Sequence, residues 1–391
     1  MYGAQLIHAL RKRLHDIEFF GVGGERMREA GCVTVVDAKD LAVVGITEIL
    51  GHLPKIYGLF HNLIAEADRR RPDLAIVIDS PAFNWRVARQ MKKRGVPVVY
   101  YVAPQFWAWR QGRVKLLRKY VSKALVIFPF EEKFYRDWGV DATFVGHPLA
   151  ELPTPAISRD EYAKQNGLDA KKPWITLMPG SRVKEVRMNL GTMVDSVLLL
   201  GREYEYLLPV APTLNPEFLS REVREDEWGD ARIELPYIKL VPDTLPALSH
   251  SRAGIVASGT ATVEAAMIGT PFVMVYRVSP LTYALGKPRI KVPYFAMVNL
   301  IAGEKIVPEL VQHDFTAANV VSHVRELLAE GDARTRMVAG FAKVRTRLKP
   351  TVTETRSAAD RAAEEVLRLL TPGSLVPSAS NGNPAARIRV Q

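Results

Sequence analysis

A run of small residues at Val256–Glu264, VASGTATVE, is the clearest sign of chemistry in the sequence. It predicts a buried strand that stops where a helix begins at once. The turn between them is built from four small residues: Ser258, Gly259, Thr260 and Ala261. Free backbone N–H groups and the positive end of the helix dipole make such a turn a good phosphate site. Glu264 follows about one turn into the helix, where its carboxylate can accept hydrogen bonds from ribose hydroxyls. A simple capping box explains the same spacing and is the alternative.

A second strand-to-turn signal, MPGSR, lies at Met178–Arg182. Gly180 can adopt a positive φ without steric cost. Ser181 and Arg182 come next, and a guanidinium can bind two phosphate oxygens at once. A turn that merely carries a surface arginine is the alternative. Two such turns in one domain favour a diphosphate site more than either turn does alone.

An acidic residue, Asp79, ends the apolar run Ala75–Asp79. Catalytic groups of open α/β sheets lie at the carboxyl ends of strands. A carboxylate in that place can act as a general base. An aspartate that caps the next helix is the alternative.

Aromatic and basic residues are interleaved at Tyr101–Arg110, YVAPQFWAWR. This mixture is compatible with nucleic-acid binding, a sugar platform or core packing. Gln105, Trp107 and Arg110 are therefore candidates for a binding cleft, together with His147 further along the chain. Core packing of the aromatic residues and a hinge role for His147 are the simpler interpretations.

The net charge of +11 is concentrated in one segment. Residues 80–130 contain eleven Lys and Arg and no Asp or Glu, whereas the rest of the chain has 42 of each sign. Such a segment indicates an anionic partner, which can be a nucleic acid, a phosphorylated substrate or a membrane surface. A solvated basic face is the alternative.

The elements that must position these residues alternate along the 391-residue chain, which is long enough for two domains. The predicted strands are 18–22, 75–79, 96–102, 124–128, 143–145, 174–178, 205–210, 239–241, 254–257 and 272–276. The predicted helices are 2–14, 59–71, 84–94, 112–120, 130–138, 184–202, 216–225, 260–269, 317–330 and 333–370, the last broken at Pro350. This alternation is typical of a doubly wound parallel α/β fold. The single cysteine, Cys32, rules out an intrachain disulfide framework and favours a reducing compartment.

Four segments are expected from the pattern. They are a first Rossmann-like domain at 1–150, a second at 151–335, C-terminal helices at 336–370 and a disordered tail at 371–391. The proline-rich residues 148–158 form the expected linker. Ligands of such a fold bind in the crevice at the carboxyl ends of the strands.

These motifs, in this order, resemble the lipid-A-disaccharide synthases, glycosyltransferase family 19 of the GT-B fold. The matching motifs include LAVVGITEIL (41–50), IDSPAFN (78–84), YVAPQFWAWRQGR (101–113), PFEEKFY (129–135), FVGHPL (144–149), LMPGSRVKE (177–185), ASGTATVE (257–264) and VNLIAG (298–303). The resemblance covers nearly the whole chain up to about residue 330. It implies an α/β protein of GT-B type, with two facing Rossmann-like domains and a C-terminal helical segment that packs back on the first domain.

The resemblance also implies a reaction. The family joins UDP-2,3-diacylglucosamine to 2,3-diacylglucosamine 1-phosphate and releases UDP, a step of lipid A and lipopolysaccharide biosynthesis at the cytoplasmic face of the inner membrane. Transfer proceeds with inversion, so the acceptor 6-hydroxyl must lose a proton, and Asp79 matches the family aspartate proposed for that role. Arg182 and the helix start at 258–261 match the groups that stabilise the leaving UDP. Glu264 matches the ribose-binding glutamate, and Asn299 matches an asparagine of the loop that closes over the nucleotide. No metal and no cofactor are implied.

An apolar stripe in the first half predicts contact with a membrane. Its members recur at steps of three or four residues: Ile46, Ile49, Leu50, Leu53, Ile56 and Phe60. A core-facing stripe is the alternative. The neighbouring positive charge and the acylated substrates favour an anionic membrane surface as a partner. Homo-oligomerisation is left open by the sequence.

Two other functions fit part of the pattern. One is another GT-B enzyme that uses a UDP-sugar, either a UDP-N-acetylglucosamine 2-epimerase or the transferase that builds the peptidoglycan disaccharide. The other is a basic nucleic-acid-binding protein, whose affinity would fall steeply with salt. We expect no nucleic-acid partner, because that function gives no reason for the two phosphate-type turns.

The first residues raise a separate expectation. The chain opens on a predicted helix at Tyr2, whereas the family carries a strand and a glycine-rich acidic loop before this point. Without that strand, the strand at 18–22 lacks a neighbour in the sheet. We therefore expect Met1 to be an internal methionine, with a natural start about 20 residues upstream by analogy with the family. Reading the in-frame DNA upstream of Met1 is the direct test, and a stop codon immediately before Met1 would contradict the expectation.

Overall fold

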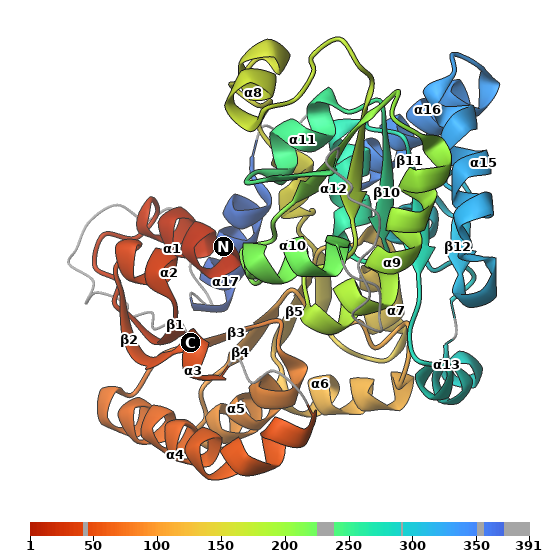
Figure 1. Cartoon of the computed structure of the whole chain (residues 1–391). Coiled ribbons are helices and arrows are strands. Elements are labelled where there is room, and N and C mark those ends of the chain that lie inside the picture. Colours follow the sequence, from red (N-terminus) through yellow and green to blue (C-terminus); the bar gives the residue numbers. More distant parts are fainter. Residues whose placement is uncertain (42–45, 225–237, 291, 350–355, 371–391) are drawn as a thin grey trace. The chain divides into compact units, whose positions relative to one another are not determined.

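The computed structural model describes residues 1–41, 46–224, 238–290, 292–349 and 356–370 (Figure 1). The chain divides into two compact units. Unit 1 comprises Met1–Pro148 and Lys349–Gln391, and unit 2 comprises Leu149–Leu348. The break after Pro148 falls at the start of the expected linker.

Unit 1 contains two separate parallel sheets. Its strands are β1 (Phe19–Gly23), β2 (Cys32–Asp37), β3 (Ala75–Ile78), β4 (Val98–Tyr101), β5 (Lys123–Val126) and β6 (Ala142–Phe144). Its helices are α1 (Tyr2–Arg11), α2 (Glu25–Glu29), α3 (Ala38–Leu41), α4 (Ile46–Arg70), α5 (Pro81–Lys93), α6 (Val114–Tyr120), α7 (Pro129–Asp137) and α17 (Ala358–Leu370). Within the described residues, β1 and β2 pair only with each other, and β3 to β6 pair in sequence order.

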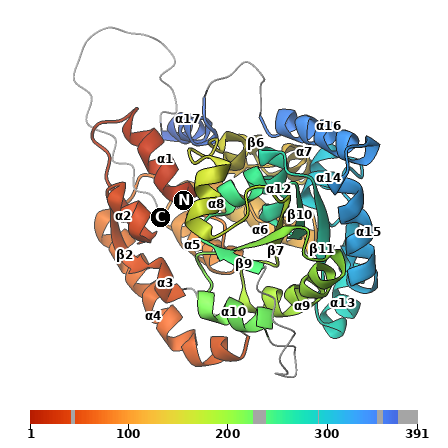
Figure 2. The ribbon, with the colours of Figure 1, turned by 45° about the horizontal axis from the view of Figure 1, so that its top comes forward.

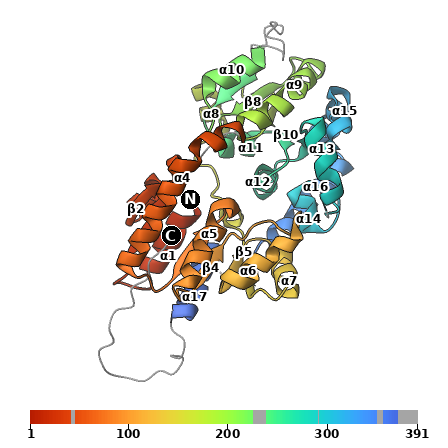
Figure 3. The same ribbon diagram turned by 90° about the horizontal axis from the view of Figure 1, so that it is seen from below.

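The core of unit 1 explains why its strands β3 and β4 are apolar. Every residue of β4 is buried, as expected for a parallel strand that is covered on both faces. Helix α4 contains Pro54 and lies alongside β2 and α5 (Figure 3). Phe60 of α4 packs edge-to-face on Phe83 against this core. Phe60 therefore belongs partly to the core, as the alternative interpretation of the stripe predicted, and Ile56 is half-buried.

Unit 2 carries one six-stranded parallel sheet. Its strands are β7 (Trp174–Met178), β8 (Glu205–Pro209), β9 (Ile238–Val241), β10 (Ala253–Ala257), β11 (Phe272–Tyr276) and β12 (Glu309–Val311). Its helices are α8 (Arg159–Asn166), α9 (Val183–Leu200), α10 (Pro216–Arg224), α11 (Thr244–His250), α12 (Thr260–Ile268), α13 (Pro280–Gly286), α14 (Met297–Ala302), α15 (Ala317–Leu328) and α16 (Asp332–Arg347). Helix α15 packs against β10, β11 and α9 (Figure 2).

The strand order of unit 2 is β12-β11-β10-β7-β8-β9. This is the doubly wound order in which the first strand is central and the chain reverses direction beside it. Here the reversal lies between β7 and β10, so the carboxyl ends of these two strands flank the expected ligand crevice.

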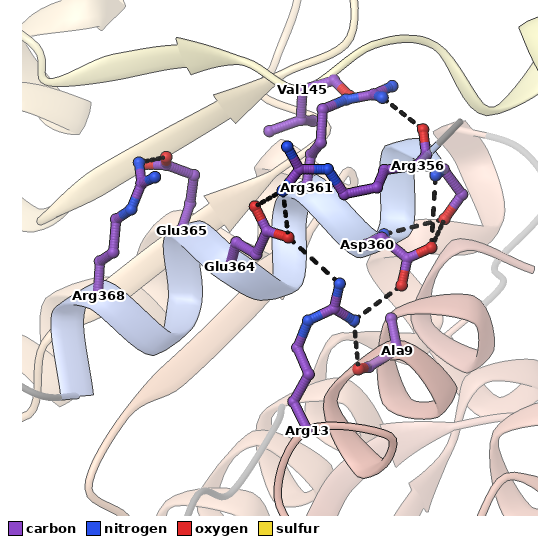
Figure 4. A network of polar contacts seen from close by, with 10 residues as sticks. Ala9, Arg13, Val145, Arg356, Asp360, Arg361, Glu364, Glu365 and Arg368 are labelled. Carbon is purple, nitrogen blue, oxygen red and sulfur yellow. Dashed lines mark hydrogen bonds and ion pairs between the residues drawn. The ribbon is translucent and has the colours of Figure 1, made fainter. Parts of the chain in front are cut away.

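The C-terminal helical segment is divided between the two units, which corrects the expectation of one separate segment at 336–370. Helix α16 packs on α12 and α14 of unit 2, where Phe341 stacks on Phe272. Helix α17 packs on α1 of unit 1. Figure 4 shows how Arg13 fixes this contact, because its guanidinium pairs with Asp360 at 2.8 Å and with Glu364 at 3.3 Å.

Candidate functional site

The two turns singled out in the sequence lie side by side in unit 2. Met178, the last residue of β7, pairs in register with Val256 near the end of β10. The turn at 179–182 therefore starts beside the turn at 257–261. Both lie at the reversal point of the doubly wound sheet, which is where such folds bind nucleotides.

One carboxylate, that of Glu185, makes two of the contacts that hold the turn after β7. Gly180 has a φ of 127°, as its predicted freedom allows. Glu185 accepts hydrogen bonds from the backbone N–H of Ser181 at 3.0 Å and from the Arg182 guanidinium at 2.7 Å. The Arg182 side chain is nonetheless 80% exposed. A pre-oriented guanidinium that stays open to solvent is well placed to bind an anion.

Asn189 is a site residue that the sequence analysis missed. It is buried in α9, where its amide nitrogen donates to the Pro179 carbonyl oxygen at 2.9 Å. Its amide oxygen accepts from the backbone N–H of Arg277 at 3.1 Å, just beyond β11. Asn189 thus ties the turn after β7 to the end of a strand that is 88 residues further on, a contact that no local pattern signals.

The turn after β10 is not a capping box. Gly259 is the N-cap residue of α12, with a φ of 143°, and no side chain caps this helix. Gly259 and Thr260 are exposed. The Ser258 hydroxyl donates to the Phe295 carbonyl oxygen at 2.9 Å, so it fastens the loop before α14. The first N–H groups of α12 are therefore the natural hydrogen-bond donors to a phosphate.

Glu264 and Asn299 differ in how they are placed. Glu264 is half-buried, and its burial raises the pKa of its carboxyl group. Asn299 is fully buried. Its amide oxygen accepts from the N–H groups of Ile306 and Val307 at 2.8 and 3.0 Å, and its amide nitrogen donates to Glu309 at 2.9 Å. Asn299 therefore holds the loop after α14, with both polar atoms of its side chain bonded to protein groups.

Glu309 is the second residue that the sequence analysis missed. Its carboxylate accepts from the N–H groups of Phe295 and Ala296, at 3.1 and 2.8 Å, as well as from Asn299. Because Ser258 is bonded to the Phe295 carbonyl, Glu309 and Asn299 support the loop that adjoins the start of α12.

Asp79 lies at the carboxyl end of β3 in unit 1, with an exposed side chain. Asp79 and Ser80 have φ values of 49° and 41°, a left-handed pair that non-glycine residues seldom adopt. The Asp79 carbonyl oxygen fixes this turn, because it accepts from the Tyr100 hydroxyl at 2.6 Å and from the Asn84 amide at 2.7 Å. Ser80, not Asp79, occupies the N-cap position of α5, and no side chain caps this helix, so the helix-cap interpretation of Asp79 is wrong.

The structure buries two of the four candidate cleft residues, which corrects their interpretation as ligand contacts. Trp107 is buried and donates its indole N–H to Glu131 at 2.8 Å. His147 is fully buried beside Phe128, and its burial lowers its pKa to about 4. Gln105 and Arg110 are exposed.

The buried carboxyl group of Glu131, which accepts from Trp107, makes stability depend on pH. Burial raises the pKa of Glu131 to about 7, from an ordinary value of 4.5. The folded state therefore binds this proton more tightly than the unfolded state does. The resulting stabilisation is complete below pH 4.5 and is lost as the pH rises to about 7.

We expect the Tm difference between wild type and Glu131→Gln to shift in favour of the variant between pH 5 and pH 8. Thermal unfolding across this range is the measurement. Glu132→Gln, on the same helix but partly exposed, should follow wild type, and a parallel shift in both variants would contradict the assignment.

Gly180→Ala should disable the turn after β7. A Cβ at this position would lie 2.6 Å from the Glu185 Cβ and 2.7 Å from its Oε2, at a φ that alanine disfavours. The Glu185 side chain must then move and lose its hydrogen bonds to Ser181 and Arg182. The unfavourable backbone conformation at position 180 adds about 1–3 kcal/mol of strain. We expect affinity for UDP to fall at least about tenfold, as measured by calorimetry. Gly201→Ala, at a φ of 94° but with nothing within 4 Å, should leave the affinity unchanged.

Solved structures share this fold over nearly the whole chain. The glycosyltransferase of kitacinnamycin superposes with a TM-score of 0.60 at 15% identity, over 95% of this chain and 97% of that chain. The UDP-GlcNAc 2-epimerase of Neisseria meningitidis, bound to UDP-GlcNAc, gives a TM-score of 0.53 at 11% identity, over 94% and 95%. Together with the doubly wound sheet of unit 2, these likenesses define the GT-B class, with two Rossmann-like domains.

Sequence comparison identifies the particular member of that class. The family profile for lipid-A-disaccharide synthetase matches residues 1–363. The lipid-A-disaccharide synthase of Koribacter versatilis is 52% identical over 94% of both chains. That of Acidobacterium capsulatum is 48% identical over 94% of this chain and 93% of its own. The chain belongs to the lipid-A-disaccharide synthase family, as its motifs predicted, and is a glycosyltransferase of lipid A biosynthesis.

Proposed function

We propose that the protein transfers 2,3-diacylglucosamine from its UDP conjugate to 2,3-diacylglucosamine 1-phosphate with inversion. The observation that carries this proposal is the pair of turns at the reversal point of unit 2. They bring the Arg182 guanidinium and the first N–H groups of α12 to one edge of the sheet. This arrangement suits the diphosphate of a UDP-sugar, and Glu264 lies within the same helix to accept from the ribose.

The proposed chemistry assigns one step to each group. The acceptor 6-hydroxyl oxygen attacks C1 of the donor sugar, while the bond between C1 and the β-phosphate oxygen breaks. The hydroxyl proton passes to the Asp79 carboxylate. Negative charge that develops on the leaving UDP is stabilised by Arg182 and by the start of α12. Gln105 and Arg110 are the exposed candidates for the acceptor, and Arg110 also stacks on Trp109.

One incubation tests this function. The protein is mixed with UDP-2,3-diacylglucosamine and 2,3-diacylglucosamine 1-phosphate, and the products are identified by mass spectrometry. We expect a disaccharide 1-phosphate and an equal amount of UDP, with a β-anomeric coupling in the proton NMR spectrum. Turnover of UDP-N-acetylglucosamine alone, or an α-linked product, would contradict the proposal.

We also propose that the protein acts as a peripheral protein on the inner face of the inner membrane. No helix within the described residues is long and apolar enough to cross a membrane. Basic residues of α5 and α6 are exposed on unit 1, including Lys92, Lys93, Lys115 and Lys119. The side chains of Ile46, Ile49, Leu50 and Leu53 lie outside the described residues, so the apolar stripe of α4 stays a prediction.

Replacing Ile49, Leu53 and Ile56 by serine tests that stripe. We expect the variant to dissociate from anionic vesicles in a sedimentation assay. It should unfold at the wild-type temperature, because under this proposal the three wild-type side chains contact lipid rather than the core. Loss of the folded state would show that the stripe is core and would contradict the membrane assignment.

A further inference from the structure

Helix α13 presents an apolar face to solvent. Leu281 and Leu285 are 70% and 56% exposed. Ala284, three residues after Leu281, is exposed as well, and so is Pro288 in the 3-10 turn that follows the helix. Residues at these spacings share one side of a helix. A surface helix normally turns such a stripe toward the core, so the outward direction of this one requires an explanation.

Fraying does not explain the exposure, because α13 is anchored at its start. Ser279 is its N-cap, accepts from the Thr282 N–H at 3.4 Å, and is followed by Pro280 in the first helical position. Val278, one residue earlier, is clamped by the side chain of Gln312. That amide accepts from the Val278 N–H at 2.7 Å and donates to the Val278 carbonyl oxygen at 3.0 Å. The apolar face is therefore displayed by a fixed element.

The charge around α13 is positive. Lys287 is exposed directly after the helix, and Arg289 and Lys291 follow in the sequence. No Asp or Glu occurs in the sequence from Ala265 to Gly303. An apolar face followed in the chain by basic residues complements a surface that is apolar within and negative at its rim, which describes an anionic lipid layer.

The position of α13 in unit 2 fits that partner. The helix follows the carboxyl end of β11, whose Val275 pairs with Ala257 of β10. The Ser258 N–H donates to the Val275 carbonyl oxygen at 2.9 Å. Helix α13 therefore leaves the sheet at the same edge as the nucleotide turns, so a lipid surface against it would lie on the side of unit 2 where an acylated donor must arrive.

We propose that Leu281, Ala284, Leu285 and Lys287 form a contact between unit 2 and an anionic phospholipid surface. Its benefit to catalysis rests on the proposed function, in which the donor carries acyl chains. The contact itself depends only on the surface described above. It is separate from the stripe of α4, which belongs to unit 1.

Vesicle binding by the full chain tests the contact without any substrate, so its outcome does not depend on the proposed reaction. The vesicles contain phosphatidylcholine with about 30 mol% phosphatidylglycerol, so that the surface is anionic. We expect the double variant Leu281→Ser, Leu285→Ser to partition at least about tenfold more weakly than wild type. The control variant Leu198→Ser, Leu199→Ser changes two leucines of α9 that are 38% and 55% exposed, and it should bind within about twofold of wild type.

Charge and lipid insertion are measured separately. Lys287→Gln should weaken binding to the anionic vesicles about fivefold and leave binding to pure phosphatidylcholine unchanged. For insertion, Leu285→Cys and Leu199→Cys are labelled with the fluorophore NBD. Cys32 is buried and its pKa is raised to about 11, so the introduced thiol reacts selectively. We expect anionic vesicles to brighten and blue-shift the label at 285 but not the label at 199.

Three outcomes would overturn the proposal. In the first, the Leu281→Ser, Leu285→Ser variant binds vesicles as tightly as wild type, and vesicles leave the NBD spectrum of the label at 285 unchanged. Another is a wild-type protein that binds no vesicles. The last is a change of oligomeric state in this variant, seen by light scattering, with vesicle affinity retained, which would show that a second copy of the chain covers α13.

Discussion

Asp79→Asn is expected to lower kcat by about 10²–10⁴-fold while UDP affinity stays at the wild-type value. Asparagine keeps the shape of the side chain but cannot take the proton of the acceptor hydroxyl. It also tolerates the left-handed backbone at this position, where φ is 49°. The loss therefore reports the missing base rather than a distorted turn.

The surroundings of Asp79 explain why the turn should survive the substitution. The contacts that fix it are made to its carbonyl oxygen, by the Tyr100 hydroxyl and the Asn84 amide, and not to its carboxylate. UDP binding is assigned to unit 2, so a variant of unit 1 should leave it intact. Steady-state kinetics with both substrates and calorimetry with UDP separate the two effects.

Asp73→Asn is the matched control, because Asp73 is exposed just before the same strand, β3, begins. It removes the same charge from the opposite end of the strand and should leave kcat within about twofold of wild type. Near-normal turnover by Asp79→Asn, or an equal loss in both variants, would remove Asp79 from the mechanism. Asp79→Ala should be as inactive as Asp79→Asn and, because alanine disfavours the left-handed region, also less stable.

The central strands of unit 2 could be predicted because buried parallel strands consist of continuous runs of apolar residues in the sequence. The limits of β7 and β11 agree with the sequence analysis, and β10 begins one residue earlier than predicted. Short or half-exposed elements carry no such signal. Strand β12 has three residues, and most residues of β2 are only partly buried or exposed, so neither was predicted. Helix α13 was missed because its leucines face solvent, opposite to the pattern that predicts a surface helix.

The candidate site could be predicted in its turns but not in its supports. Gly180 and Gly259 indicate a turn, because glycine can adopt backbone conformations that other residues avoid. Asn189 and Glu309 act through partners far away in the sequence, and nothing in their immediate neighbours distinguishes them from ordinary polar residues. Trp107 and His147 were matched to ligand-binding positions by type, but residue type alone does not show whether a side chain faces a cleft or the core.

Arg182→Ala is expected to lower kcat/KM for the UDP-sugar by about 10²–10³-fold, the usual effect of removing one preorganised donor to a developing negative charge. The Arg182 side chain is 80% exposed, so its removal leaves no cavity and should not change the Tm. Glu185 keeps its bond to the Ser181 N–H, so the turn itself should hold.

Arg182→Lys separates the charge of this side chain from its geometry. Lysine keeps the positive charge but has no planar fork for two phosphate oxygens, so we expect only part of the activity to return. Arg187→Ala is the matched control. Arg187 lies five residues further along the chain, in α9, and is 60% exposed, with a 3.4 Å pair to Glu222; its removal should change kcat/KM less than about twofold.

The division of the Arg182 effect between KM and kcat identifies the moment at which the guanidinium acts. If Arg182 binds the diphosphate equally in the ground state and the transition state, KM rises and kcat stays constant. We expect kcat to fall as well, because breaking the bond to C1 places new charge on the β-phosphate beside the start of α12. Wild-type kcat/KM in Arg182→Ala would contradict the placement of the diphosphate at these two turns. Equal losses in Arg182→Ala and Arg187→Ala would indicate a general effect of surface charge instead.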